Sequence, residues 1–133
     1  MTNLEKDRYN GLLRERTLVM AVNVYNLFQS KNVSPITMPV IRQIIRSSSS
    51  VAANYHAATR ARSDAEFLSK ICIVNEECDE TDFWLNYLKR INFLSADESR
   101  IIQDEVNQLV RIFCTIKMKM KNKIRGQRSE KKI

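Results

Sequence analysis

The sequence contains little glycine and little proline, with two residues of each among 133. Sheet proteins use such residues at the turns that join their strands, so this chain has too few turn residues for a sheet. The composition therefore favours an all-α fold. A chain of this length can bury one hydrophobic core and is short for two domains.

Histidine and the usual catalytic motifs are also scarce. The one histidine, His56, has no glutamate three residues before it, whereas a di-metal carboxylate bundle uses Glu-x-x-His pairs on facing helices. The sequence has no glycine-rich phosphate loop and shows no nucleophile with a base and an orienting group. We therefore expect a protein that is not an enzyme and that uses no metal or other cofactor.

Cysteines and long hydrophobic runs, which mark secreted and membrane proteins, are few. The three cysteines, Cys72, Cys78 and Cys114, lie in apolar helical patterns, which predicts buried free thiols and argues against disulfides. The longest uncharged stretch, residues 17–30, contains three amide side chains and is too short to cross a bilayer. No signal peptide opens the sequence, so we expect a soluble, cytoplasmic protein.

What the sequence does contain is helical periodicity in four segments, at about residues 12–30, 38–61, 64–92 and 96–122. Apolar residues recur there three and four positions apart, as on the core-facing side of a helix. The first segment has Leu13, Thr17, Met20, Val24 and Leu27, with Leu18, Val22 and Tyr25 widening the stripe. The third has Phe67, Ile71, Val74, Cys78, Thr81, Leu85 and Leu88. The fourth has Ile102, Val106, Leu109, Phe113, Ile116 and Met120.

Four consecutive serines, residues 47–50, stand in the middle of the second segment. The helical rhythm continues through them, from Ile44 to Ser48 to Val51, and no glycine or proline interrupts it. The run therefore predicts a helix whose small side chains let another helix approach closely. The alternative is a local break at these residues that would act as a linker.

Three helix starts are marked in the sequence. Pro39 suits the first turn of the second helix, where its missing N–H would have no partner. Ser63 with Glu66, and Ser95 with Glu98, match the capping box at the third and fourth helices. Short connections between these helices make consecutive helices antiparallel. We therefore predict an up-down-up-down four-helix bundle over residues 1–116.

Aromatic residues gather at the end of the third segment, which carries Trp84 and Tyr87 beside Phe83. A monomer is not expected to bury this much aromatic surface at one end of a helix. We expect Trp84 and Tyr87 to form a second apolar face for self-association. A wide single core is the alternative.

The net positive charge lies in a basic C-terminal extension, residues 117–133, whose last part we expect to be disordered. Its eight cations are Lys117, Lys119, Lys121, Lys123, Arg125, Arg128, Lys131 and Lys132, and Glu130 is its one acidic residue. The rest of the chain has 14 basic and 14 acidic residues. Interspersed cations predict binding to nucleic-acid phosphates with weak sequence preference. A role in solubility alone is the alternative.

An acidic stretch lies in the third segment, at Glu76, Glu77, Asp79, Glu80 and Asp82. Paired carboxylates can serve catalysis or hold a cation. Their helical spacing is more typical of a solvated face, or of partners for arginines on a neighbouring helix such as Arg42 and Arg46.

Two stretches, IRQIIRSSSSVAANY at residues 41–55 and RARSDAEFLSKICIVNEECDETDFWLNYLKRINFL at residues 60–94, together resemble one family. It is the four-helix-bundle family named after proteins encoded in intervening sequences of bacterial large-subunit ribosomal RNA genes. The residues at its pattern positions are Arg46, Ser47, Ser50, Asn54, Glu77, Glu80, Thr81, Asp82, Phe83, Trp84, Leu85, Phe93 and Leu94. The similarity extends over most of residues 12–116. Many relatives continue Asn-Ile-Ala-Glu-Gly where this chain has residues 54–58, Asn-Tyr-His-Ala-Ala.

The resemblance implies a left-handed bundle that assembles into a ring-like homo-oligomer, typically a pentamer, without catalytic activity. The family is also similar to the accessory proteins of diversity-generating retroelements, which bind nucleic acid and a reverse transcriptase. It further implies that Arg46, Ser50, Asn54 and Glu80 form a polar network between helices. Two hypotheses follow for this chain. One is an oligomer that binds RNA or DNA, with RNA preferred, and the other is a protein–protein adaptor or scaffold with no nucleic-acid role.

Overall fold

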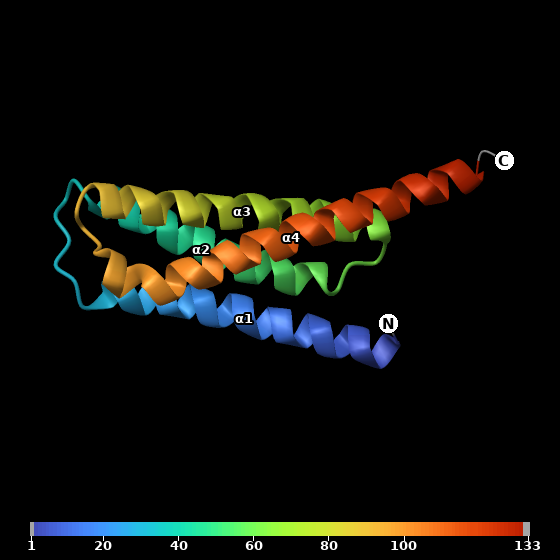
Figure 1. The fold of residues 1–133 in the computed structure, drawn as a ribbon, viewed down its shortest axis with the longest axis horizontal. Coiled ribbons are helices and arrows are strands. Elements are labelled where there is room, and N and C mark those ends of the chain that lie inside the picture. The colour runs from blue at the N-terminus through green and yellow to red at the C-terminus, as the bar shows by residue number, and fades with distance from the viewer. Residues whose placement is uncertain (1, 132–133) are drawn as a thin grey trace.

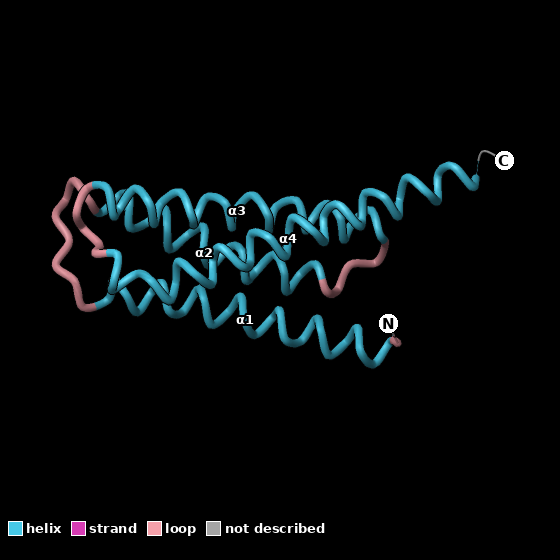
Figure 2. Tube along the Cα trace, viewed as in Figure 1, coloured by secondary structure: helices cyan, strands magenta, loops and turns pink. Residues whose placement is uncertain are grey.

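The structure, a computed structural model, describes residues 2–131. Four helices, α1 (Asn3–Gln29), α2 (Met38–Ala58), α3 (Asp64–Arg90) and α4 (Ala96–Lys131), run alternately up and down in one bundle (Figure 1). The α1–α2 and α3–α4 loops lie at one end, and the α2–α3 loop lies at the other (Figure 2). The predicted all-α, up-and-down four-helix bundle is confirmed.

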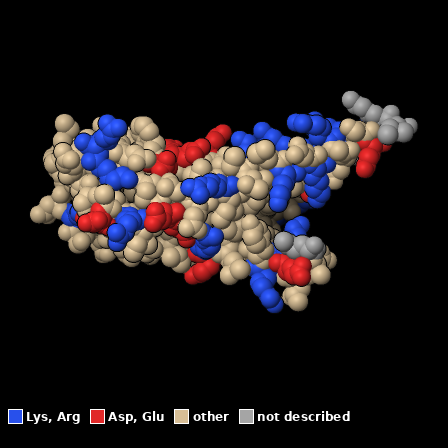
Figure 3. Space-filling model, in the orientation of Figure 1, with Lys and Arg blue, Asp and Glu red and all other residues tan. Residues whose placement is uncertain are grey.

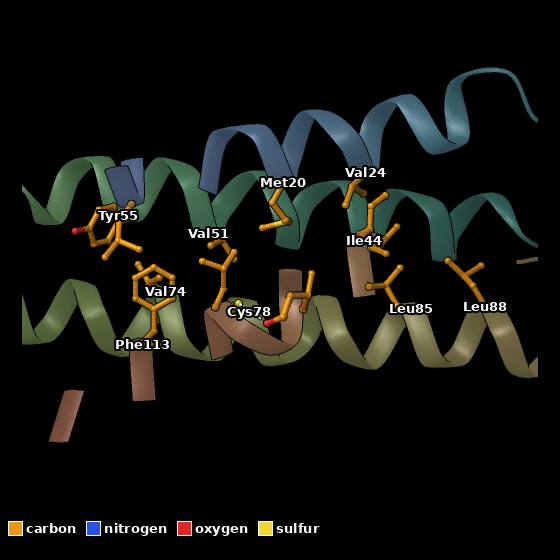
Figure 4. Packing of buried hydrophobic residues seen from close by; sticks show 14 of the residues in the cluster. Met20, Val24, Ile44, Val51, Tyr55, Val74, Cys78, Leu85, Leu88 and Phe113 are labelled. Carbon is orange, nitrogen blue, oxygen red and sulfur yellow. Dashed lines mark hydrogen bonds between the residues drawn. The ribbon is translucent and has the colours of Figure 1, made fainter. Parts of the chain in front are cut away.

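The core runs along the bundle between all four helices. Figure 4 shows Met20, Ile44 and Leu85 pointing into it from three different helices. The predicted stripes of the third and fourth segments supply most of the rest, including Val74, which is fully buried. Each methylene removed from water stabilises the fold by about 0.8 kcal/mol, so these stripes explain why consecutive helices pack as neighbours.

The serine run is helical, as predicted, and it forms part of the contact between α2 and α3. Ser47 and Ser48 are buried, and the Ser47 hydroxyl lies 2.9 Å from the Thr81 hydroxyl of α3. Each hydroxyl also lies within hydrogen-bond distance of a backbone carbonyl of its own helix. The carbonyl near Ser47 is that of Ile44, and the carbonyl near Thr81 is that of Glu77. Small polar side chains therefore allow the two helices to approach without leaving a buried hydroxyl unpaired.

The helix ends follow the predicted signals with one variation. Ser95 and Glu98 form both hydrogen bonds of a capping box, at 2.8 and 3.1 Å. At α3 the Ser63 hydroxyl accepts from the Glu66 N–H, but the Glu66 carboxylate accepts from the N–H of Arg62 instead of that of Ser63. Pro39 lies in the first turn of α2, as predicted.

The end of α3 depends on Asn92, which adopts a left-handed conformation with φ of 60°. Its N–H bonds to the carbonyl of Lys89, and the N–H of Phe93 bonds to the carbonyl of Leu88 at 2.9 Å. This is the Schellman arrangement, in which asparagine is one of the few residues other than glycine that fits. It closes α3 at Arg90, slightly before the expected end near residue 92.

The first helix differs from the prediction at its start and on one face. It begins at Asn3, nine residues before the expected start, because Thr2 and Glu5 form a further capping box. Leu18, Val22 and Tyr25 do not widen the core stripe, because they are 53%, 47% and 52% exposed. They lie about a quarter turn or more around the helix from the buried positions, where the neighbouring helices leave them largely uncovered. We call these three residues the α1 outer face.

The fourth helix continues to Lys131 instead of ending near residue 122 with disorder beyond it. Lysine, arginine, methionine and glutamine are good helix formers, and residues 117–131 contain neither proline nor a β-branched run. The end of this helix projects beyond α3, away from the N-terminal end of α1 (Figure 1). The basic extension is therefore an ordered part of α4 over the described residues.

The cysteines are free thiols in three different environments. Cys78 is fully buried, and burial raises the pKa of its thiol to about 12. Cys72 is partly exposed and Cys114 is exposed. The prediction of buried thiols is therefore right for Cys78 and wrong for Cys114, whose position on α4 lies outside the core stripe.

Candidate nucleic-acid interface

The cations of the C-terminal extension are displayed along the last turns of α4. Lysine and arginine side chains gather there on the surface shown in Figure 3. Five of them are exposed, namely Lys119, Lys121, Lys123, Arg125 and Arg128. Lys117 is half-buried. Lys131 is the last residue of the helix, and Lys132 lies outside the described residues.

These cations divide between two flanks of the helix. Lys117, Lys121, Arg125 and Arg128 are spaced by four, four and three residues, which places them in one row along α4. We call this row the basic stripe. Lys119 and Lys123 are turned away from it by more than a third of a revolution, because each residue advances about 100° around a helix. The extension therefore has a continuous positive side instead of a diffuse charge.

The basic stripe forms one wall of a groove between α4 and the start of α3, with a volume of about 450 Å³. Lys121, Arg125 and Arg128 line the α4 side of the groove, together with Ile124. The α3 side consists of Ala65, Leu68, Ser69 and Cys72. Uncharged residues thus face the cations, and no carboxylate belongs to the lining of this groove.

The opposite flank fastens the extension to α3. The Asp64 carboxylate accepts from the Lys123 ammonium at 3.3 Å and from the Gln127 amide at 3.3 Å. Both donors lower the pKa of the Asp64 carboxyl, the Gln127 hydrogen bond most strongly. We call this set of contacts the Asp64 clamp. It holds α4 against α3 at the level of the basic stripe, because Lys123 and Gln127 lie between Lys121 and Arg128 along the chain.

A second cavity of about 290 Å³ lies at the same end of the bundle, on the clamp side of α4. Lys6 of α1 and Arg62 of the α2–α3 loop line it together with Lys123. Asp64 is the carboxylate in the lining. Cations from three parts of the chain therefore extend the positive surface beyond the basic stripe.

The predicted polar network divides into two separate groups. Arg46 of α2 donates to Glu80 at 2.6 Å and to Glu77 at 3.1 Å, and Trp84 also donates to Glu80. The hydrogen bond that Arg46 donates to Glu80 lowers the pKa of the Glu80 carboxyl and raises the pKa of the Arg46 guanidinium. This group joins α2 to α3, as expected for the acidic stretch and Arg46.

Ser50 and Asn54 form the other group, which lies within α2. The Asn54 amide donates to the Ser50 carbonyl and to the Ser50 hydroxyl, both at 2.9 Å. Residues four apart on a helix are neighbours, so these contacts stay on one helix and do not bridge two. Ser47 and Thr81, which the polar-network hypothesis left out, make the hydroxyl contact between α2 and α3.

Phe83, Trp84 and Tyr87 form a cluster on α3, which we call the α3 aromatic patch. The rings of Phe83 and Trp84 have centroids 4.9 Å apart, and those of Trp84 and Tyr87 are 5.5 Å apart. Phe83 is 56% exposed and Tyr87 is 42% exposed, whereas Trp84 is partly covered. Phe83 therefore presents the most open ring of the patch, although the sequence pointed to Trp84 and Tyr87.

The α1 outer face is a further surface that sequence reasoning missed. It borders a groove of about 590 Å³ between α1 and α2 whose lining includes Leu18 and small residues. The small residues are Gly11, Ala21, Ser49, Ala52 and Ala53. The spacing of Leu18, Val22 and Tyr25 was the available signal, because the three form a stripe of their own beside the core stripe.

Residues 2–131 contain neither a cluster of metal-binding side chains nor a helix suited to crossing a membrane. Between residues 2 and 131, no three or more His, Cys, Asp or Glu side chains are grouped so that they could hold a metal ion. Over the same residues, no helix combines the length and the apolar character that crossing a membrane requires.

The architecture and the surface define a class, a small up-and-down helical bundle with a basic C-terminal helix end. Within that class the chain belongs to the 23S rRNA-intervening sequence protein family, whose model matches residues 13–114. The family indicated by the sequence is thus confirmed. The match ends before Lys117, so the basic stripe lies outside the matched region.

A solved structure shows the same fold. It is the crystal structure of a protein of unknown function from the S23 ribosomal protein family of Bacteroides thetaiotaomicron. The two chains are 27% identical and superpose with a TM-score of 0.68, over 79% of this chain and 97% of the other. No curated protein matches the chain.

Proposed function

We propose that the protein is a non-enzymatic, self-associating helical bundle that binds nucleic acid, with RNA as the first ligand, through the basic stripe. The observation that carries this proposal is the row of Lys117, Lys121, Arg125 and Arg128 on one flank of a fixed helix. Residues 117–133 hold 8 of the 22 basic residues and 1 of the 15 acidic residues of the chain. The formal net charge of +7 is therefore concentrated at one end of the bundle.

The physical basis of binding is the release of counterions from phosphates. Each phosphate neutralised by a lysine or arginine contributes a slope of about −0.9 to the dependence of log K on log salt for a duplex. Four contacts would give a slope of roughly −3.6, which weakens binding on the order of a hundredfold between 50 and 200 mM salt. Such contacts read the backbone and carry no direct sequence information.

Self-association would strengthen this binding. The α1 outer face and the α3 aromatic patch expose two distinct sets of apolar side chains, and different surfaces that meet head to tail can close into a ring. A ring of copies, a pentamer in the family resemblance, would present several basic stripes to one ligand, and multivalency raises avidity without new contacts. A protein partner such as a reverse transcriptase would bind to the same apolar surfaces.

The test is fluorescence anisotropy of a labelled RNA hairpin with the full chain at 50 and 200 mM salt. We expect salt-sensitive binding that is lost in Lys121→Glu/Arg125→Glu. The matched control, Arg42→Glu/Arg100→Glu, changes the net charge equally at exposed cations outside the extension and should retain binding. Equal loss in the two double variants would show that net charge, and not the basic stripe, accounts for binding.

The adaptor function is the second candidate, and the exposed rings of Phe83 and Tyr87 favour it. Under that function no RNA would bind even at low salt. Tyr87→Glu should reduce the mass measured by light scattering, because it puts a charge into the contact. Asn86→Glu, at the exposed neighbouring position, is the control and should leave the mass unchanged. An unchanged mass for Tyr87→Glu would exclude the α3 aromatic patch as the contact.

A further inference from the structure

The basic extension is helical through Lys131 and is bonded to α3, whereas the sequence alone predicts a partly disordered tail. The Asp64 clamp joins α4 to the first residue of α3 through Lys123 and Gln127. Arg125 lies between these two contacts in the chain, and Arg128 directly follows the second. Because the cations of the basic stripe lie on one helix, they keep fixed positions relative to one another, and the clamp holds that helix against α3.

Their spacing along the helix is regular. Four residues of α-helix advance about 6 Å, so Lys117, Lys121 and Arg125 follow at that interval, and the row reaches Arg128 after about 17 Å. Phosphates along one strand of a duplex also keep fixed positions, about 3.4 Å apart along the helix axis, while the strand winds around that axis. Long lysine and arginine side chains can follow this winding from a row of fixed attachment points.

The groove offers little to a single strand. Proteins that hold single-stranded nucleic acid combine a basic groove with aromatic side chains on which bases stack. Among the described residues that line this groove, none is aromatic. Tyr87, in the α3 aromatic patch, lies about 35 Å further along α3 from Asp64. Phe67 lines the neighbouring cavity on the clamp side, where it packs against the core. Unpaired bases would thus find cations in this groove without a stacking surface.

We propose that the interface selects double-stranded over single-stranded nucleic acid, because the Asp64 clamp holds the basic stripe in place as a rigid row, and a duplex presents phosphates in equally fixed positions. This proposal rests on the proposed nucleic-acid function. Asp64 acts as a positioning residue, since its carboxylate accepts from Lys123 and Gln127 of the helix that carries the cations. Duplex RNA and duplex DNA both present regular phosphates, so the selection is for paired strands.

The experiment compares three probes with the full chain by anisotropy at one salt concentration. They are a 20-base-pair RNA duplex, the DNA duplex of the same sequence, and a 20-nucleotide oligouridine. We expect the RNA duplex to bind roughly tenfold tighter than oligouridine, a difference of about 1.4 kcal/mol. Tighter binding of the DNA duplex than of oligouridine supports the proposal equally. Equal binding of duplex and single strand would overturn it and leave the proposed function intact, whereas no binding of any probe would overturn both.

Two variants separate rigidity from charge. Asp64→Ala removes one negative charge, so a charge effect alone would tighten binding to every probe. If the clamp is needed to keep the row rigid, the ratio of duplex to single-strand affinity should fall instead, because the end of α4 is no longer bonded to α3. Glu130→Ala removes an exposed carboxylate of the same extension with the clamp intact, and it should keep the ratio. An unchanged ratio in Asp64→Ala would overturn the clamp argument.

A further pair of variants distinguishes loss of the clamp from a folding defect at the start of α3. Gln127→Ala weakens the clamp without touching α3, and we expect a smaller fall in the same ratio. Asp64→Glu retains a carboxylate that can reach both donors, and it should restore the ratio. Circular dichroism should show the helical content of the unmodified chain for each variant. A ratio that follows helical content instead of the clamp would refute the positioning role of Asp64.

Discussion

The hydroxyl oxygens of Ser47 and Thr81 lie 2.9 Å apart between α2 and α3, and both residues are fully buried. A side chain larger than serine at position 47 would enter the space that Thr81 occupies. The pair thus explains why the serine run is a packing element of the helix and not a linker.

Replacing Ser47 tests this packing. Ser47→Ala removes one buried hydrogen bond while Thr81 still donates to the Glu77 carbonyl, so it should cost about 1 kcal/mol of unfolding free energy. Ser47→Leu should cost more, about 1–3 kcal/mol, because overpacking forces the helices apart. Urea denaturation measures both changes. Ser49→Leu, at an exposed position of the same run, should change the free energy by less than about 0.5 kcal/mol, and a cost equal to that of Ser47→Leu would contradict the packing argument.

The contact between Arg46 and Glu80 predicts an acid dependence of stability. The pKa of Glu80 is lowered in the folded state, mainly by the hydrogen bond from Arg46. The stabilisation is therefore present above the pKa of glutamate in the unfolded chain and is lost as pH falls through the lower folded value. Both side chains are partly exposed, so the effect should be below about 1 kcal/mol.

The measurement compares the unfolding free energy at pH 7 and at pH 3. In Arg46→Ala the difference between the unfolding free energies at the two pH values should shrink, because the Glu80 carboxylate loses its main partner. Arg42→Ala removes another exposed arginine of the same helix and should leave the difference unchanged. If Arg46→Ala preserves the full pH dependence, the pair contributes nothing to acid stability.

The fold could be predicted from the sequence because its signals are local. Periodic apolar positions such as Val74 and Leu85, and the capping pair Ser95 and Glu98, each specify a helix without knowledge of the others. Tertiary contacts could not be read in the same way. The exposure of Leu18 depends on which helices flank α1, because an apolar stripe looks the same whether or not a neighbour covers it.

The candidate site was predicted in composition but not in geometry. The cations of the extension were evident from their density, and like-charge repulsion argued for disorder beyond the helix. Asp64 reverses that expectation, because it accepts from Lys123 and Gln127, about sixty residues further along the chain. A contact at such separation in sequence leaves no periodic signal. The division of the cations between two flanks becomes meaningful only once the helix is known to continue through Lys131.

The exposure of the cysteines predicts their order of reaction with a thiol reagent. Cys114 is exposed and should react fully in the native protein, with Cys72 slower because it is partly covered. Cys78 is buried and its thiol pKa is raised to about 12, so it forms little of the reactive thiolate and should react only after unfolding. A colorimetric thiol assay at pH 8, with and without urea, counts the groups. Cys114→Ser should remove the fast phase, and a fast phase that persists in this variant would contradict the assignment.

The two flanks of α4 predict different effects of single lysines on the salt dependence of RNA binding. Lys121 belongs to the basic stripe, so Lys121→Ala should reduce the magnitude of the log–log slope by about 0.9, the contribution of one phosphate contact with a duplex. Lys119 is exposed on the other flank, and Lys119→Ala should leave the slope nearly unchanged although it removes the same charge. Titrations of an RNA duplex at four salt concentrations determine the slopes. If the cations form a fixed row, only the flank in contact with phosphates releases counterions. Equal reductions of the slope by the two variants would therefore show that the extension binds through its total charge and not through the basic stripe.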